Sequence, residues 1–263
     1  MNTQPAVNEL FRLDGQIALV TGGAGLYGKP ISRALAQAGA TVVVASRSRD
    51  TCEAFAAELR GENLESEGEL LDMANAASVG ALAKRLEERF GGVQILVNNA
   101  YARVLDPKTS GTPGEWMESL RANILGIHLC TEAFVAGMIK AGSGSIVNIG
   151  SIYGVVGPDF RAYDGQPFSS PPDYAFIKGG LLQYSRYCAT KYAKHGIRVN
   201  CLSPGGYESG QPRPFQEHYN NRVPLGRMAE DLDIAGPVVF LASEASRYIT
   251  GANLMLDGGL TAW

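Results

Sequence analysis

Short apolar runs rich in β-branched residues alternate with amphipathic stretches along most of the chain. This alternation constrains the fold more than any other feature, because strands separated by helices form a parallel sheet with helices on both faces. The runs predict seven strands, over 16–22, 40–46, 68–71, 93–100, 144–151, 197–206 and 252–259. The stretches between them predict helices over 28–39, 50–60, 75–90, 113–140 and 173–194. We therefore expect an α/β fold with a doubly wound, seven-stranded parallel sheet.

No linker, repeat or low-complexity tract divides this series, so we expect one domain over residues 1–263. Two stretches, 154–172 and 204–225, are rich in Gly, Pro and aromatic residues and are predicted to be irregular. Both leave strands at the carboxyl edge of the sheet, where ligands bind in folds of this kind. We expect them to be substrate loops over the active face.

Composition excludes several classes of function. The formal net charge of −3 offers no broad basic face for nucleic acid. The four cysteines are scattered without a Cys-x-x-Cys pair, and the three histidines share no ligand spacing, so we expect reduced thiols and no metal site. No apolar run approaches the ~18 residues that span a bilayer, and the start of the chain has no signal-peptide core. We expect a cytoplasmic protein without a membrane partner.

The segment TGGAGLYG, residues 21–28, follows the first predicted strand and opens the first predicted helix. Glycines let the backbone approach a pyrophosphate, and the helix N-terminus supplies N–H groups and a positive dipole. Leu26 occupies a place where a glycine is often found. The turn predicts a dinucleotide site that includes Gly22, Gly25, Leu26 and Tyr27.

The end of the second strand bears on the choice of cofactor. An acidic residue there would bind the ribose 2′-hydroxyl of NAD, whereas an arginine would favour the 2′-phosphate of NADP. This chain has Ser46 and Arg47 at that place. NADP is therefore favoured, and NAD stays possible.

Three residues have the chemistry of a proton-transfer site. Tyr174 and Lys178 lie four residues apart, on one face of a predicted helix, and Ser151 ends the fifth strand. A nearby ammonium favours phenolate, so we expect Lys178 to lower the pKa of Tyr174, while Ser151 binds the substrate oxygen. Tyr187 and Lys191 have the same spacing, but they lie about 20 Å further along the helix and face another direction. We therefore assign the reaction to Tyr174.

A set of motifs occurs in one order: TGGAGLYG, NNA at 98–100, Asn123, Ser151, YAFIK at 174–178, SPGG at 203–206 and LDGG at 256–259. In this order the motifs are highly specific. Over essentially its whole length the chain resembles the short-chain dehydrogenase/reductase family. The resemblance implies a single-domain Rossmann fold, a nicotinamide cofactor, and a homotetramer or dimer.

The resemblance also implies roles for individual residues. Asn98 would stabilise the central strands, and Asn123 would position a water that links Lys178 to a proton relay. Asp72 would contact the adenine, and the backbone after Pro204 would meet the nicotinamide. The implied cofactor contacts are Asp72, Met73, Asn99, Ala100, Tyr174, Lys178, Pro204, Gly206, Tyr207 and Ser209.

Three features depart from the compact members of that family. Tyr101 stands where a glycine is usual, so a side chain is expected in the substrate region. Ser151 and Tyr174 are 23 residues apart, about ten more than the resemblance leads one to expect, which implies an enlarged loop. The glycine spacing is the form common in the longer, sugar-nucleotide branch.

The enlarged loop suits a polyhydroxylated substrate. The expected substrate contacts, besides Tyr101, are Arg161, Tyr163 and Arg213; Asp159, Asp164, His218 and Arg222 offer further polar groups. We expect a sugar, sugar-acid or polyol dehydrogenase that interconverts a secondary alcohol and a ketone or lactone.

Three alternatives remain open. A 3-oxoacyl carrier-protein reductase would need a basic patch and an apolar acyl channel. A non-catalytic dinucleotide sensor would typically lack the tyrosine or the lysine, and both are present. A sugar-nucleotide epimerase, which the glycine spacing alone would allow, usually carries a separate C-terminal substrate region.

Overall fold

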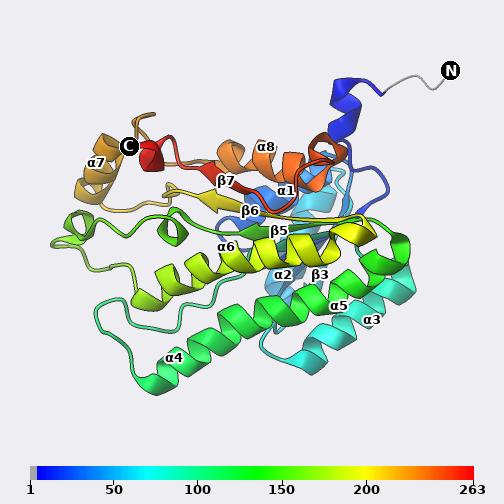
Figure 1. The fold of residues 1–263 in the computed structure, drawn as a ribbon, viewed down its shortest axis with the longest axis horizontal. Coiled ribbons are helices and arrows are strands. Elements are labelled where there is room, and N and C mark those ends of the chain that lie inside the picture. Colours follow the sequence, from blue (N-terminus) through cyan, green and yellow to red (C-terminus); the bar gives the residue numbers. More distant parts are fainter. Residues whose placement is uncertain (1–4) are drawn as a thin grey trace.

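The computed structural model describes residues 5–263 and contains one seven-stranded parallel sheet (Figure 1). The strand order is β3-β2-β1-β4-β5-β6-β7, which confirms the doubly wound α/β prediction. The strands are β1 (Ile17–Thr21), β2 (Thr41–Ser46), β3 (Ser66–Leu70), β4 (Ile95–Asn98), β5 (Gly144–Ile149), β6 (Ile197–Pro204) and β7 (Asn253–Leu256). The order reverses between β1 and β4, and a ligand crevice is expected at this switch point.

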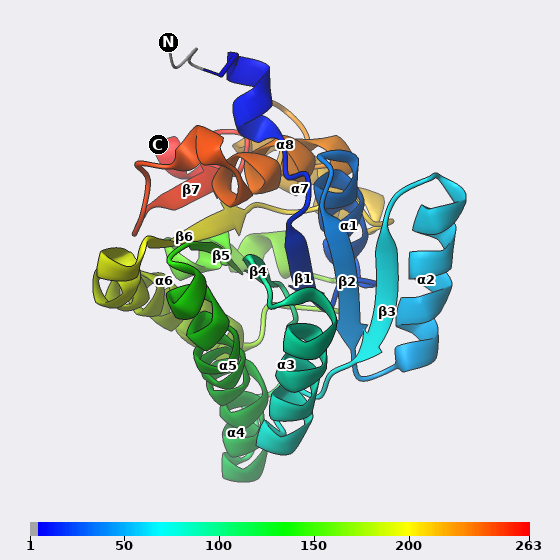
Figure 2. The same cartoon turned by 90° about the vertical axis from the view of Figure 1, so that its right-hand side faces the viewer.

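Two layers of helices cover the sheet, one on each face (Figure 2). One core cluster joins the sheet to α1 (Gly28–Gln37), α2 (Arg49–Gly61) and α8 (Asp231–Ala242). The other joins it to α3 (Ala76–Phe90), α5 (Gly126–Ala141) and α6 (Pro172–Tyr192). β1 is buried at all five positions, as expected of a central parallel strand covered on both faces.

The helix ends carry recognisable capping residues. Asn75 and Ser48 accept backbone N–H bonds at the starts of α3 and α2. Thr112 and Glu115 form a capping box around Pro113 at the start of α4 (Pro113–Leu120). These local signals explain why the predicted boundaries fall close to those observed.

The structure corrects the prediction that residues 204–225 are irregular throughout. They contain α7 (Arg213–Arg222), a polar helix that buries only Phe215 and Tyr219. The pattern also did not indicate α8, whose interior contains Pro237. Both helices pack buried side chains against the rest of the molecule, Phe215 and Tyr219 from α7 and Ile234, Val238 and Leu241 from α8.

The helix predicted over 113–140 is interrupted rather than uniform. A π-helical turn, Arg121–Leu125, separates α4 from α5. Of the helices in residues 5–263, only the combined segment Pro113–Ala141 is long and apolar enough to cross a membrane by length and composition. A core helix of a soluble protein passes the same test, and Ile127, Phe134 and Met138 lie in the core.

Candidate active site

A cleft of about 1260 Å³ opens where the strands end, between the two predicted substrate loops. It contains the four predicted catalytic residues and all of the predicted cofactor contacts. Its lining includes Gly22, Gly25, Leu26, Tyr27, Ser46, Arg47, Asp72, Met73, Asn99, Ala100, Asn123, Ser151, Tyr174, Lys178, Pro204, Gly206, Tyr207 and Ser209. Tyr101 and Tyr163, two of the four predicted substrate contacts, line it as well.

The other two predicted substrate contacts do not line the cleft. Arg161 pairs with Asp159, Nε to Oδ1 at 2.8 Å, and points to solvent. Arg213 pairs with Glu217 one turn along α7, and 88% of its side chain is exposed. Neighbouring carboxylates therefore hold both guanidinium groups away from the cleft.

The glycine turn is shaped by a close backbone approach. A Cβ on Gly28 would lie 2.0 Å from the carbonyl oxygen of Gly22, so only glycine fits there. Gly22 itself has a φ of +63°, which favours glycine. The Asn99 side chain donates to the Thr21 and Gly22 carbonyls at 3.0 Å each, which joins the ends of β1 and β4. The result is a rigid cradle at the start of α1 that fits a pyrophosphate.

The adenosine end of the cleft has a free cation. Arg47 is exposed, lines the cleft, and makes no salt bridge or side-chain hydrogen bond within residues 5–263. Ser46 contacts the Cys52 thiol at 3.0 Å. Asp72 accepts a hydrogen bond from the Ala74 amide at 3.0 Å. Arg47 can therefore turn toward a 2′-phosphate without breaking another interaction.

Lys178 and Tyr174 lie beside each other in the first turns of α6. The buried Lys178 ammonium donates to the Ile149 carbonyl at 2.7 Å and lies 5.7 Å from the centroid of the Tyr174 ring. Burial lowers the pKa of Lys178 to about 8. An amine with that pKa can exchange a proton near neutral pH.

The lowering of the Tyr174 pKa by Lys178 stays a prediction. Burial raises the pKa of the Tyr174 phenol, while a hydrogen bond from Ser151 and the charge of Arg103 act in the opposite direction. The Lys178 ammonium faces the Ile149 carbonyl instead of the phenol oxygen. Of the two groups that lower the Tyr174 pKa, Ser151 has the larger effect and Arg103 the smaller.

Asn123 lies in the π-helical turn between α4 and α5, a kind of distortion that is common at functional sites. Its amide group accepts from the Ala102 N–H at 2.7 Å and donates to the Ala102 carbonyl at 2.9 Å. These bonds fix the segment after β4 beside the predicted catalytic residues. The rival Tyr187 is 58% exposed, outside the cleft, and its partner Lys191 pairs with Glu132.

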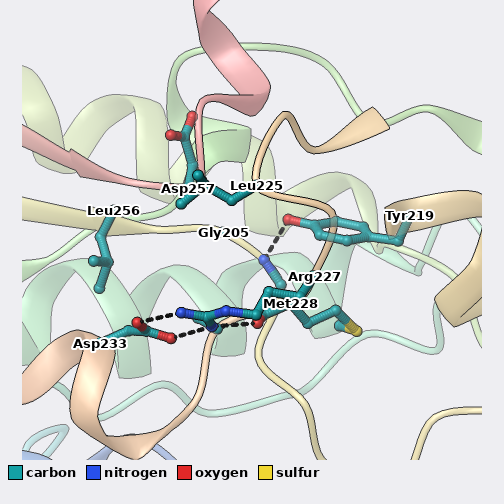
Figure 3. Close-up of a pocket in the computed structure, with 11 residues that line it drawn as sticks. Gly205, Tyr219, Leu225, Arg227, Met228, Asp233, Leu256 and Asp257 are labelled. Carbon is teal, nitrogen blue, oxygen red and sulfur yellow. Dashed lines mark hydrogen bonds and ion pairs between the residues drawn. The ribbon is translucent and has the colours of Figure 1, made fainter. Parts of the chain in front are cut away.

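A second, small pocket of about 70 Å³ lies behind the loop that follows β6 (Figure 3). The Tyr219 hydroxyl accepts from the Gly206 N–H there, and Arg227 pairs with Asp233. On the other side of the loop, the Tyr27 hydroxyl donates to the Gly205 carbonyl at 2.9 Å. The pocket is too small for a nucleotide, and its residues support the loop from behind. Tyr219 was not predicted, because nothing in the sequence places it under this loop.

The substrate end of the cleft is lined by aromatic rings from both loops. The Tyr153 and Tyr163 hydroxyls lie 2.8 Å apart, and Phe168 and Phe215 pack edge to face at 5.1 Å. Ser170 also lines the cleft, and its buried hydroxyl has no hydrogen-bond partner. Of these residues only Tyr163 was predicted, because the pairings join segments far apart in sequence.

The described residues contain neither a candidate metal site nor a disulfide. In residues 5–263 no group of three or more His, Cys, Asp or Glu side chains is placed to hold a metal ion. The four cysteines are buried free thiols.

Known proteins are similar to this chain in sequence and in fold. Residues 25–261 match a family model described as enoyl-(acyl carrier protein) reductase. D-threitol dehydrogenase of Mycolicibacterium smegmatis is 35% identical over 95% of each chain. A 3-oxoacyl-[acyl-carrier-protein] reductase of Vibrio cholerae is 32% identical over 94% of this chain and 98% of its own.

A solved structure agrees with these relatives. The gluconate 5-dehydrogenase of Burkholderia cenocepacia, in complex with NADP and tartrate, has a TM-score of 0.89 at 31% identity, covering 98% of this chain and 100% of its own. The protein therefore belongs to the short-chain dehydrogenase/reductase family and is an NAD(P)-dependent oxidoreductase that acts on CH–OH groups.

Proposed function

We propose that this protein oxidises a secondary alcohol of a small polyol, sugar or sugar acid, in a reversible reaction that prefers NADP. The buried, unpartnered hydroxyl of Ser170 at the substrate end carries this proposal. A buried polar group without a partner is costly, and a substrate hydroxyl would satisfy it. The threitol and gluconate dehydrogenases among the similar proteins support the same substrate class.

Three residues of the cleft have separate roles in the reaction. Ser151 holds the substrate oxygen, and Tyr174 removes the hydroxyl proton as the carbonyl forms. In its amine form Lys178, which lies beside the Tyr174 ring and against the Ile149 carbonyl, accepts that proton from the phenol and so restores the phenolate. NADP, when bound in the glycine cradle, supplies the hydride acceptor.

The preference for NADP depends on the free guanidinium of Arg47. A guanidinium binds phosphate through two parallel hydrogen bonds, and Arg47 has no competing carboxylate within residues 5–263. The NADP in the gluconate 5-dehydrogenase structure supports this preference.

A 3-oxoacyl carrier-protein reductase is the second candidate. The similarity to the Vibrio cholerae enzyme and the aromatic side chains at the substrate end favour it. An extended acyl chain would, however, leave the Ser170 hydroxyl unpartnered, whereas a polyol would bind it.

A substrate panel separates the two candidates. D-Threitol, galactitol, D-gluconate and a 3-oxoacyl thioester are each assayed with NAD and NADP by nicotinamide absorbance. We expect turnover of a polyol or sugar acid, with higher kcat/KM for NADP. Activity confined to the thioester would overturn the polyol proposal.

We also propose that the protein is a cytoplasmic homotetramer or dimer. Exposed apolar side chains of α4, the π turn and α6 support an assembly: Met117, Ile124, Leu125, Phe176 and Tyr187. Light scattering coupled to size exclusion tests this, because a mass near 28.0 kDa would show a monomer.

A further inference from the structure

A buried carboxylate lies directly before the catalytic tyrosine. Asp173 has no solvent exposure, and its Oδ2 accepts hydrogen bonds from the Ser119 hydroxyl at 2.5 Å and the Tyr101 hydroxyl at 3.3 Å. Its Oδ1 has no partner, and within residues 5–263 it forms no salt bridge. Burying a carboxylate without a countercharge is costly, so its presence here needs an explanation.

The position of Asp173 offsets part of this cost. It is the second residue of α6, where the helix dipole favours a negative charge. A dipole alone does not require burial, since Asp50 holds the same position in α2 and is exposed. The burial of Asp173 therefore reflects its contacts with Ser119 and Tyr101.

Tyr101 connects this carboxylate to the reacting group. Its ring packs edge-on against the ring of Tyr174, with centroids 5.0 Å apart and an angle of 87°. The Lys178 ammonium lies 5.7 Å from the centroids of both rings. The Tyr101 ring thus packs against the Tyr174 ring. The hydroxyl at the end of the Tyr101 side chain is held by its hydrogen bond to Asp173.

The other contact of Asp173 extends to the π-helical turn. The Asn123 amide donates to the Ser119 hydroxyl at 3.2 Å, and Ser119 in turn donates to Asp173. One carboxylate therefore ties together the segment after β4, the end of α4 and the start of α6. Of these segments, the one after β4 supplies the Tyr101 ring, and the start of α6 carries Tyr174 itself.

We propose that Asp173 and Tyr101 are positioning residues for the dehydrogenase reaction: the Asp173 carboxylate anchors the Tyr101 hydroxyl, and the anchored ring fixes the plane of Tyr174. The proposal rests on the reaction class and not on the polyol substrate. A ring held at the correct angle keeps the phenol oxygen near Ser151 and the substrate hydroxyl. A misplacement of the reacting group by about 1 Å can cost up to 10²-fold in rate.

Kinetics on the full chain test this proposal. Asp173→Asn, Tyr101→Phe and the double variant are compared with Asp50→Asn, at the matching helix position, and with the fully exposed Tyr248→Phe. We expect each single variant to lower kcat by about tenfold. KM and the NADPH dissociation constant, measured by fluorescence, should change less than twofold. The double variant should lose no more than either single variant, because both remove the same anchor.

A spectroscopic measurement needs no substrate. The protein is labelled with 3-fluorotyrosine, and the ¹⁹F resonance of Tyr174 is assigned from its loss in Tyr174→Phe. We expect this resonance to shift or broaden in Asp173→Asn and Tyr101→Phe, and to stay unchanged in both controls. If Asp173→Asn does not fold, Tyr101→Phe and Ser119→Ala provide the same comparison.

The outcomes separate this proposal from the proposed substrate. An unchanged Tyr174 resonance in Tyr101→Phe, or losses in kcat that multiply in the double variant, would overturn the positioning role. An enzyme inactive on every polyol but with the expected shift of the Tyr174 resonance would overturn only the polyol assignment.

Discussion

The two ends of the cleft are built in different ways. The nucleotide end consists of backbone at the ends of β1, β4 and β6, shaped by glycines whose spacing fixes the geometry. The substrate end consists largely of side chains from 153–172 and from α7, together with Tyr101, and these meet only after folding. The geometry of the nucleotide end depends on local sequence. The geometry of the substrate end depends on contacts between residues far apart in the sequence. This difference predicts where substitutions abolish the reaction and where they only change its selectivity.

The largest effect is expected at the junction of the two ends, at Tyr174. Tyr174→Phe removes the proton-transferring hydroxyl and keeps the ring, so we expect kcat to fall by about 10³-fold with cofactor binding unchanged. Tyr187→Phe, with the same spacing to a lysine, should keep normal kcat because Tyr187 lies outside the cleft. Stopped-flow measurement of hydride transfer in both variants checks the assignment. Loss of activity in Tyr187→Phe alone would reverse it.

The next effect concerns the nucleotide end. Gly28→Ala places a Cβ 2.0 Å from the Gly22 carbonyl, and overpacking of this kind costs about 1–3 kcal/mol and displaces the turn. We expect the affinity for NADPH to fall by more than about tenfold because the cradle no longer fits the pyrophosphate. Urea unfolding and NADPH fluorescence measure the two losses.

Gly80→Ala is the matched control for this change. Gly80 lies inside α3, and a Cβ there meets no atom within 4 Å. We expect the free energy of unfolding to rise by about 0.5–1 kcal/mol. If Gly28→Ala and Gly80→Ala had the same effect on unfolding and on NADPH affinity, the close approach at Gly28 would not be needed for the shape of the turn.

A smaller effect is expected where the nucleotide end discriminates between cofactors. Arg47→Ala removes the free guanidinium, so the KM for NADP should rise by about tenfold while that for NAD changes little. The neighbouring Arg49→Ala, which does not line the cleft, should change neither. Steady-state kinetics of both variants with NAD and with NADP test this prediction. Equal effects on NAD and NADP would remove Arg47 from cofactor selection.

At the substrate end, Ser170→Ala should act on substrate binding. We expect the KM for the polyol to rise about five- to tenfold, the loss of roughly one hydrogen bond, with kcat less affected. The variant should not change the NADPH dissociation constant. A Ser170→Ala enzyme with unchanged KM on every substrate would contradict the role of this hydroxyl.

The smallest effect is expected at Arg213. Its guanidinium is paired with Glu217 and exposed, so Arg213→Ala should leave kcat/KM within about twofold. The panel of polyols and sugar acids provides the measurement. A large loss for an anionic substrate would show that α7 moves Arg213 into the cleft during turnover.

The residues that line the nucleotide end of the cleft could be predicted one by one, because each signal lies in a short segment. Gly22 and Gly28 bound the turn, Asn99 follows β4, and Tyr174 and Lys178 share one helix face. The order of these segments along a βαβ series then fixes the edge at which they meet.

The substrate end could not be predicted in the same way. Arg161 and Arg213 have the right chemistry, but Asp159 and Glu217 hold them at the surface. Ser170 and Tyr219 acquire their roles only through neighbours on other elements. The sequence therefore predicted which loops line the substrate end, but only two of the four expected contacts, Tyr101 and Tyr163, lie in the cleft.

By itself, the sequence determined the parallel sheet, the glycine cradle and which predicted catalytic residues meet in one cleft. Each of these depends on periodicity, on spacing or on a conformation that only glycine adopts. The tertiary structure decided that α7 is a helix, that burial raises the pKa of Tyr174, and that a buried Asp173 holds Tyr101. These depend on desolvation and on contacts between distant segments, because neither exists until the chain has folded.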